Sequence, residues 1–403
     1  MLIVSSPHTS NSNNWYNVNN NGNNNNNNTN NANGVARELC VRWIPKIMQN
    51  GINITSGDVS CSNKVSGTMN AIFSFENLYR AYEKCTLGVK WKWSTQNYMV
   101  NACCRIARLE KKIKNGIYQS PPPRHFQINE RGKTRDITAL GFEDRVVNKC
   151  LCDNFLNPIL QKSLIHDNGA TIKGKGLSFT KNRVKCHLQR FYRKHGNNGY
   201  VLKMDIHHYF ESIDHDILIK KMSKRIQDKE TLMFIKQLMD TCDKGLGLGS
   251  QVSQIGAVYY LNEVDHFIKE DLHCKYYGRY MDDMYVLSNN KERLQKILQI
   301  VIEKLKPLKL QLNLSKSKIY DLKRGFIFCK TRYILTDSGK ILKLITSNAM
   351  ASMKRKIKKG IDIKNIIPAF DSYVSDFNAY KRLYRFRKSY IMRSSEVNNN
   401  EIL

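Results

Sequence analysis

Apolar residues recur at helical spacing over much of the chain. The spacing predicts helices over residues 73–85, 98–114, 142–160 and 180–194. Further helices are expected after the glycine-rich turn at 246–254 and over the amphipathic segment that Pro307 ends. Residues 347–393 are also predicted to be helical, and they are strongly basic.

Runs of aromatic and β-branched residues between these helices predict strands. Residues 124–128 and 133–137 flank a turn with Gly132, which predicts a β-hairpin. A second hairpin is expected around Tyr280-Met281-Asp282-Asp283, between strands at 275–280 and 284–287. Other strands are expected at 200–205, 310–314 and 325–335, with a basic turn at 315–319. The pattern predicts an α+β fold.

The first 36 residues have no such pattern. They are rich in asparagine, with an unbroken run from Asn23 to Asn28. A polar tract of this kind cannot bury enough apolar area to fold, so residues 1–36 are expected to be disordered. Residues 37–69 are ambiguous and are assigned to an N-terminal extension.

The chain is strongly basic, with 65 Lys and Arg against 34 Asp and Glu, a formal net charge of +31. A charge excess of this size indicates a polyanionic partner, most often nucleic acid. The alternative is a basic protein without such a partner. The 11 cysteines include no CxxC pair, and no signal peptide or membrane-length apolar run is found. We therefore expect a cytoplasmic protein that has reduced thiols, binds no zinc and does not contact a membrane.

Three acidic residues follow strand-like segments. Asp282 and Asp283 lie at the tip of the second hairpin, and Asp205 ends the apolar strand at 200–205. Adjacent carboxylates in a packed turn repel each other, and a divalent cation removes that cost. If the strands share a sheet, the three carboxylates can hold two metal ions for nucleotidyl transfer. The alternatives are an ordinary surface turn and a strand-end acid bonded to a nearby loop.

Two basic segments suit phosphate groups. Lys133 and Arg135 alternate on one face of the first hairpin, and the alternative for them is a solvated edge strand. Lys173 and Lys175 alternate with glycines, which allow close backbone approach to phosphate. The glycine spacing is not that of a nucleotide P-loop.

Tyr280-Met281-Asp282-Asp283 together with Asp205 resembles the reverse transcriptases. The resemblance covers residues from about 70 to about 390 in the family's order. It implies a right-hand polymerase fold. Its expected parts are fingers at 70–200, a palm at 201–345 that includes finger residues 220–250, a thumb at 346–393 and a tail at 394–403.

The resemblance also implies roles for individual residues. Asp205, Asp282 and Asp283 would hold two Mg²⁺ ions, with Mn²⁺ as a substitute, and Lys316 would protonate pyrophosphate. The implied nucleotide-binding residues are Lys133, Arg135, Phe210, Leu248, Gly249 and Gln254, with Phe210 excluding a ribose 2′-hydroxyl. The implied primer and template contacts are Lys173, Lys175, Tyr280, Met281 and Phe328.

Leu248-Gly249 stands where most members of the family have Gln-Gly. The pattern Leu248-Gly249, then Ser253-Gln254, resembles the reverse transcriptases of diversity-generating retroelements. Because an aliphatic side chain cannot hydrogen-bond the nucleotide, error-prone copying of a template RNA into cDNA is expected. This resemblance implies dNTPs, a cDNA primer and a small basic accessory protein as partners. It also offers a second interpretation of the asparagine tract, as a template repeat translated in frame before a true start at Met48 or Met69.

Three alternatives stay open. One is an antiphage-defence reverse transcriptase, which can extend DNA without a template. A retron or group II intron enzyme is expected less, because the thumb region lacks a Val-Thr-Gly motif and no maturase or endonuclease extension is recognisable. From another class, the chain could be a non-catalytic RNA-binding protein, although binding alone needs no metal-ligand acids.

Overall fold

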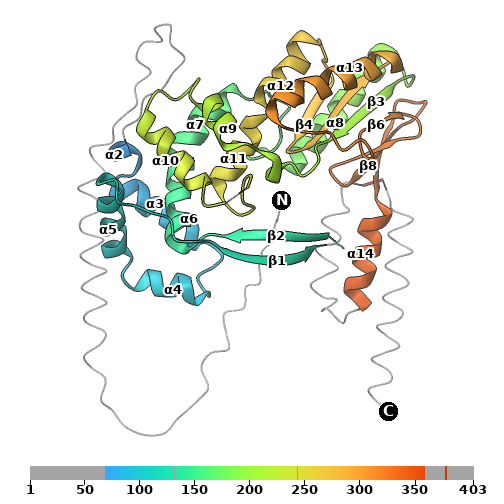
Figure 1. Cartoon of the computed structure of the whole chain (residues 1–403). Helices are drawn as coiled ribbons and strands as arrows, with labels where there is room; N and C mark the ends of the chain where they lie inside the picture. The colour runs from blue at the N-terminus through green and yellow to red at the C-terminus, as the bar shows by residue number, and fades with distance from the viewer. Residues whose placement is uncertain (1–68, 131–132, 243, 359–376, 379–403) are drawn as a thin grey trace, which may run out of the picture. The chain divides into compact units, whose positions relative to one another are not determined.

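The computed structural model describes residues 69–130, 133–242, 244–358 and 377–378. All of them belong to one unit, Lys64–Leu403. Predictions for residues 1–68, most of the predicted thumb beyond residue 358 and the tail at 394–403 lie outside the described residues. Within the described residues the fold is α+β, as predicted, with helices around a two-stranded, a four-stranded and a three-stranded sheet (Figure 1).

The four-stranded sheet carries the predicted acidic residues. Its strands run in the order β4-β5-β3-β6, and neighbouring strands are antiparallel. Their bounds are β3 (Tyr200–Asp205), β4 (Tyr277–Tyr280), β5 (Asp283–Ser288) and β6 (Lys318–Asp321). Helices α8 (Leu177–His195) and α13 (Lys291–Leu305) pack against it. Val201 and Leu202 on β3 and Val286 on β5 are at most 1 % exposed, so the sheet is anchored in the core.

The N-terminal part is helical. It comprises α2 (Met69–Ile72), α3 (Phe75–Thr86), α4 (Trp93–Val100), α5 (Ala102–Lys114), α6 (Phe142–Leu151), the π-helical turn η1 (Cys152–Leu156), α7 (Asn157–Leu160) and the 3₁₀ turn η2 (Gln161–Ser163). The hairpin of β1 (Arg124–Glu130) and β2 (Lys133–Ala139) extends from it, as predicted (Figure 1). One apolar core joins this region to the helices that follow β3.

Helices between β3 and β4 support the sheet. They are the 3₁₀ turn η3 (Phe210–Ser212), α9 (His215–Met222), α10 (Lys229–Met239), α11 (Gln251–Tyr260), α12 (Asn262–His266) and the π-helical turn η4 (Phe267–Asp271). Asp214 caps α9 as its sequence position predicts, since its carboxylate accepts a hydrogen bond from the Ile217 amide at 3.0 Å.

The C-terminal part forms the third sheet. Its strands are β7 (Phe326–Phe328), β8 (Thr331–Leu335) and β9 (Ile341–Ile345), in that order, and α14 (Ser347–Lys358) follows. Helix α13 ends at Leu305, and the 3₁₀ turn η5 (Lys306–Leu308) that follows contains Pro307, so the helix stops before the proline, as expected.

Three predicted elements differ from the structure. The helix expected over 98–114 is two helices, α4 and α5, which meet at Asn101 with φ −127°. The helix expected after the glycine-rich turn is interrupted at Leu261. The strand expected at 310–314 is wrong, because only Leu312 makes an isolated bridge, to Ile206, and the paired strand is β6. The pairing of β6 with β3 accounts for the missing strand. The two helix breaks are changes of backbone conformation at Asn101 and Leu261, and the spacing of apolar residues does not report them.

No helix in the described ranges combines the length and the apolar character needed to cross a bilayer.

Candidate active site

The acidic residues predicted from the sequence meet at one end of the four-stranded sheet. Asp205 and Asp283 are direct Cα partners across β3 and β5. Tyr280 pairs with Asp283, so Met281 and Asp282 form the two-residue turn between β4 and β5. Met281 has φ +55°, the left-handed conformation that tight hairpin turns require. The register therefore places all three carboxylates on one hairpin and the strand beside it.

Two lysines neutralise part of this negative charge. The Lys316 ammonium lies 2.7 Å from Asp205 Oδ2, and the Lys203 ammonium lies 3.1 Å from Asp283 Oδ1. The backbone amide of Asp205 donates to Ser317 Oγ at 3.2 Å, and the Asn313 amide donates to the Asp205 carbonyl at 2.7 Å. The segment that carries Lys316 is thus held against the end of β3.

Burial and the neighbouring carboxylates raise the pKa of both Asp282 and Asp283. Burial, together with Asp283 and Asp205, raises the pKa of Asp282 to about 6. Burial also raises the pKa of Asp283, and Asp205 adds to the rise while Lys203 opposes it. Burial alone would lower the pKa of Lys203, but the Asp283 carboxylate raises it overall. Carboxylates in this state gain from a cation placed between them.

These donors fit a hard divalent cation, because carboxylate oxygens are the ligands that Mg²⁺ prefers. Asp283 Oδ1 is buried and has no hydrogen-bond partner of good geometry, although the Lys203 ammonium is near it. Among the residues described, no group of three or more His, Cys, Asp or Glu side chains is already arranged as a metal site. The predicted metal ligands therefore stay a prediction.

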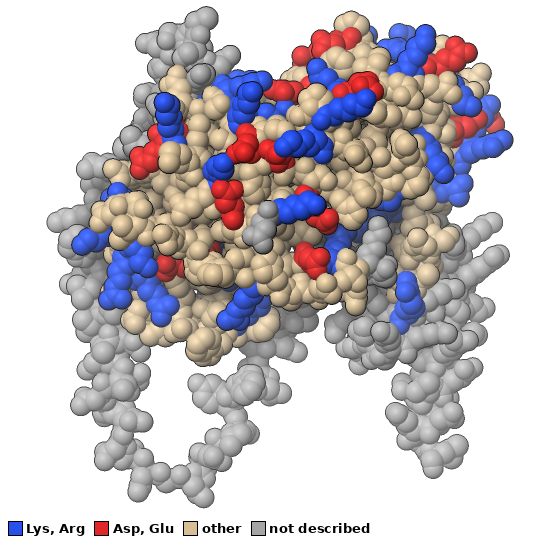
Figure 2. All heavy atoms as spheres, in the orientation of Figure 1, with Lys and Arg blue, Asp and Glu red and all other residues tan. Residues whose placement is uncertain are grey.

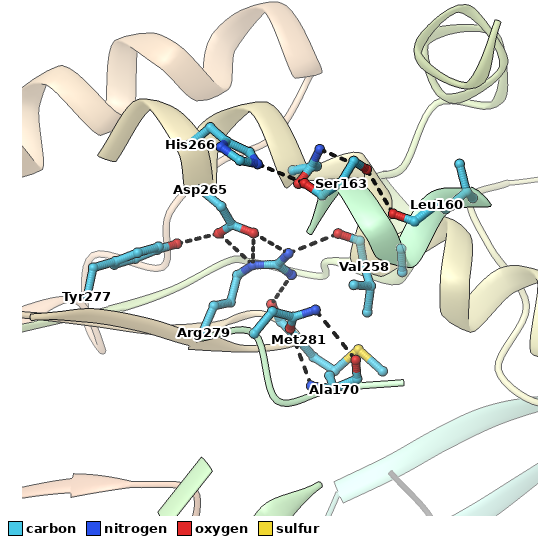
Figure 3. Close-up of polar contacts among 12 residues, drawn as sticks. Leu160, Ser163, Ala170, Val258, Asp265, His266, Tyr277, Arg279 and Met281 are labelled. Carbon is cyan, nitrogen blue, oxygen red and sulfur yellow. Dashed lines mark hydrogen bonds and ion pairs between the residues drawn. The ribbon is translucent and has the colours of Figure 1, made fainter. Parts of the chain in front are cut away.

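A buried ion pair supports the acidic turn from behind (Figure 3). Arg279 and Asp265 are both fully buried, and Arg279 Nε lies 2.8 and 2.9 Å from the two Asp265 oxygens. Arg279 Nη1 donates to the Met281 carbonyl at 3.1 Å, and Nη2 donates to the Val258 carbonyl at 2.9 Å. Tyr277 donates to Asp265 at 2.6 Å. One guanidinium thus ties the turn to α11 and α12.

A second buried cluster holds the other side of the hairpin. Asp167 accepts from Arg183 Nε at 2.5 Å and pairs with Lys269. His187 bonds the Tyr285 hydroxyl at 2.8 Å. Burial tends to raise the pKa of Asp167, but His187, Lys269 and Arg183 lower it well below its usual range. The backbone of residues 167–169 also bonds Arg279 on β4.

Strand β2 of the first hairpin contacts the glycine-rich turn at 246–254. The Thr138 amide donates to the Leu248 carbonyl at 3.2 Å. Gly249 has φ +134°, and a Cβ there would lie 2.6 Å from the Thr138 carbonyl oxygen, so this position needs glycine. The Leu246 amide donates to the Phe210 carbonyl at 2.8 Å. Three predicted nucleotide-binding residues, Phe210, Leu248 and Gly249, therefore belong to connected segments.

Other predicted contacts lie in the following places. Lys133 begins β2, Arg135 is exposed on the same strand, and Gln254 is exposed on α11. Lys173 is exposed. Lys175 instead donates to the His166 carbonyl at 2.8 Å and lies over the Phe179 ring. No described contact tests these roles.

Two predicted primer contacts are in the core. Phe328 is 0 % exposed and packs edge-on against Tyr285, with ring centres 4.8 Å apart. Tyr280 is also buried, and burial raises its pKa to about 12. On β7 the exposed side chain is Ile327, whereas Met281 is half-buried at the turn. The rings of Phe328 and Tyr280 are therefore not exposed, and the predicted primer contacts stay a prediction.

Sequence reasoning missed Arg279, Asp265 and Lys203. An arginine inside an otherwise apolar and aromatic strand was the available signal, because a fully buried guanidinium requires a carboxylate partner. Lys203 gave the same signal within the apolar strand that Asp205 ends.

The chain is similar in sequence to two curated proteins. Retron Ec73 reverse transcriptase from Escherichia coli is 25 % identical over 236 residues, which cover 54 % of this chain and 71 % of the relative. Protein YkfC from Escherichia coli strain K12 is 23 % identical over 270 residues, which cover 56 % of this chain and 70 % of that protein.

Among solved structures, the chain is similar to apo telomerase from Candida tropicalis truncated from its C-terminal domain, with a TM-score of 0.43 and 12 % identity. The match covers 55 % of this chain and 55 % of the telomerase chain.

Neither curated relative is named as a diversity-generating enzyme. One of them is a retron enzyme, the class that we expected less from the sequence because the thumb region lacks a Val-Thr-Gly motif. A three-residue motif carries less information than similarity over 236 residues. Residues 119–355 match the family described as reverse transcriptase (RNA-dependent DNA polymerase). This match spans more than half of the sequence, so the chain belongs to the reverse transcriptase family and is an RNA-directed DNA polymerase.

Proposed function

We propose that the protein extends a DNA primer on an RNA template at Asp205, Asp282 and Asp283, with dNTPs as substrates. The observation that supports this most is the register that sets Asp205 opposite Asp283, with Asp282 in the adjoining turn. Two bound Mg²⁺ ions would supply activation of the primer hydroxyl and stabilisation of the leaving pyrophosphate. Mn²⁺ is the expected substitute.

The chain's own residues would orient these reactants. Asp205 and Asp283 present carboxylates from neighbouring strands, and Lys203 limits their mutual repulsion at 3.1 Å from Asp283. Lys316 lies 2.7 Å from Asp205 and carries protons that it can give to the departing pyrophosphate. The hairpin of β1 and β2 would cover the nucleotide phosphates through Lys133 and Arg135.

We further propose the family's division into fingers, palm and thumb. The β1–β2 hairpin and the helices around it correspond to fingers at 70–200, and the four-stranded sheet corresponds to the palm at 201–345. Helix α14 would begin the thumb. A cytoplasmic location is consistent with the nine cysteines of the described ranges, which form no disulfides.

Two biological roles are proposed within this activity. The retron relative supports the alternative role, in antiphage defence, better than it supports a diversity-generating retroelement. Leu248 is the observation that favours the second role, because its side chain offers no hydrogen bond to a base. A small basic accessory protein is a prediction tied to that second role.

A primer-extension assay separates the two roles. The retroelement role predicts that Leu248→Gln lowers misincorporation opposite template adenine, with the conservative Leu248→Met as control. Equal misincorporation by parent and Leu248→Gln would remove the case for error-prone copying. Extension of a primer without any template would favour the defence role.

Metal binding can be tested without activity. At neutral pH, Mg²⁺ should raise the unfolding temperature of the parent, because a ligand that binds only the folded state stabilises it. The Asp282→Asn, Asp283→Asn double variant should show no such rise. An equal rise in both proteins would place the metal elsewhere.

A further inference from the structure

Two tryptophans protrude from the N-terminal helical region. Trp91 and Trp93 are 73 % and 77 % exposed. Both alternate with lysines, Lys90 and Lys92, which are exposed as well. We refer to these four residues as the tryptophan–lysine surface. Large aromatic side chains at this exposure lose the stabilisation that burial would give, so their retention on the surface suggests a ligand.

The turn that carries these rings is held in place. The Val89 amide donates to the Thr86 carbonyl at 3.2 Å, and the Lys92 amide donates to the Val89 carbonyl at 3.0 Å. Trp91 Nε1 donates to the Gly88 carbonyl at 3.2 Å. The next residue, Trp93, begins α4, which packs against α5 and α6. The backbone of the turn would therefore lose little conformational freedom when a ligand binds.

The segment around the two rings has more cations than acids. Residues 84–129 contain a single acid, Glu110, which pairs with Lys114 at 2.7 Å, while Lys84 and Lys112 pair with Asp153 and Glu143 from outside the segment. The cations of this stretch are Lys84, Lys90, Lys92, Arg105, Arg108, Lys111, Lys112, Lys114 and Arg124. Figure 2 shows Lys and Arg side chains gathered over the region of α4 and α5, with few acidic side chains beside them. The ammonium of Lys92 lies 5.4 Å from the centre of the Trp91 ring, so cation and ring are presented together.

We infer that the tryptophan–lysine surface binds single-stranded nucleic acid, with bases stacked on Trp91 and Trp93 and phosphates paired with Lys90 and Lys92. Bases in a single strand have free faces for stacking, whereas those of a duplex do not. The cations suit phosphates along the same strand. The surface lies on the turn before α4 and the start of that helix, and the carboxylates lie on β3 and the β4–β5 turn. The inference therefore does not depend on the polymerase reaction.

Tryptophan fluorescence can report on this surface directly. The chain has four tryptophans, so replacement of Trp15 and Trp43 by phenylalanine leaves only Trp91 and Trp93. An Asp282→Asn background in EDTA prevents synthesis. A short oligouridylate and a short oligothymidylate should quench both rings, and a blunt duplex should not. The two single-stranded probes show whether RNA or DNA is preferred.

A substitution series tests the energetic contribution. Each lost stack should weaken binding by roughly fivefold or more, so Trp91→Ser, Trp93→Ser together should weaken oligomer binding by at least about tenfold. The matched control is Met233→Ser on α10, whose side chain is also 73 % exposed, and it should bind like the parent. Binding by the double variant and by the Met233→Ser control is measured through the fluorescence anisotropy of a labelled oligomer, with Trp15 and Trp43 retained in both proteins.

Several results would overturn the inference. One is that the Trp91→Ser, Trp93→Ser variant binds the oligomers as tightly as the parent does. Another is poor acrylamide quenching in the full-length protein without ligand, which would mean that the chain itself covers the rings. A blue shift on anionic vesicles without quenching by oligomers would assign the surface to lipid instead.

Discussion

The buried Arg279–Asp265 pair gives the sharpest prediction about how the acidic turn is positioned. Arg279 is the described side chain that hydrogen-bonds the Met281 carbonyl inside the turn, at 3.1 Å. Arg279→Lys keeps the charge but loses the planar fork that holds both Asp265 oxygens and the turn together. Arg279→Met leaves Asp265 buried without its partner.

The structure sets the scale of the effect. Both side chains are fully buried, and removal of one partner from such a pair costs roughly 3–5 kcal/mol of folding free energy. The bond to Met281 comes from a charged donor, so its loss should cost about 1.5–3 kcal/mol of positioning. If that free energy is expressed in the transition state, kcat falls by about 10- to 150-fold. KM for dTTP should change little, because the turn holds the metal ligands rather than the nucleotide.

A double variant separates positioning from stability. Arg279→Met with Asp265→Leu replaces the pair by apolar side chains, which is often neutral or stabilising. We expect its urea unfolding to approach that of the parent while kcat stays low, because the Met281 carbonyl has lost its donor. Asp144→Asn is the control, since Asp144 is 1 % exposed and bonds Tyr118, away from the turn. Parental kcat in the double variant, or an equal fall of kcat in Asp144→Asn, would refute a positioning role.

Three further predictions concern single positions. Asp214→Ala should lose about 1 kcal/mol of stability at pH 7 through the missing helix cap. The Lys309 ammonium and the Ile217 amide lower the Asp214 pKa. The loss of stability in Asp214→Ala should therefore be present above the ordinary aspartate pKa of about 3.9 and shrink as the pH falls below it. A stability difference in urea unfolding that does not change with pH would contradict this. Gly249→Ala should lower stability by roughly 1–3 kcal/mol and lower kcat/KM, because the new Cβ would lie 2.6 Å from the Thr138 carbonyl oxygen. Gly116→Ala is the control: Gly116 has φ +68° and open space around it, so that variant tests the effect of backbone strain alone. Lys203→Met should destabilise the protein in EDTA by about 1–3 kcal/mol, and Mg²⁺ should recover part of that stability. The same loss of stability in both buffers would mean that Lys203 does not offset the negative charge of the carboxylates.

The sequence predicted those parts of the site that depend on local pattern. Both hairpins, the Asp214 cap and the end of α13 just before Pro307 follow from turn residues, caps and proline, which act within a few residues. The approach of Asp205 to Asp283 could be predicted once their two strands were assumed to belong to the same sheet. That assumption came from the family resemblance as well as from the strands themselves.

Other parts depend on contacts between distant segments. Arg279 finds Asp265 because α12 passes behind β4, and hydropathy does not report that approach. The strand expected at 310–314 fails because β3 pairs with β6, leaving Leu312 a single bridge. Phe328 looked available to a primer, but the packing of β7 on Tyr285 buries its ring. In each case tertiary packing decided the outcome.

Primer extension by the parent and by Asp282→Asn tests the central claim most directly. Both proteins should first show the same urea unfolding at pH 7, or a more stable variant, because burial beside Asp283 and Asp205 disfavours the ionised Asp282 carboxylate. The account predicts Mg²⁺-dependent incorporation of dTTP on a primed polyadenylate template by the parent, and a loss of at least about a hundredfold in the variant. Undiminished incorporation by a folded Asp282→Asn protein would contradict the assignment of the active site to this hairpin.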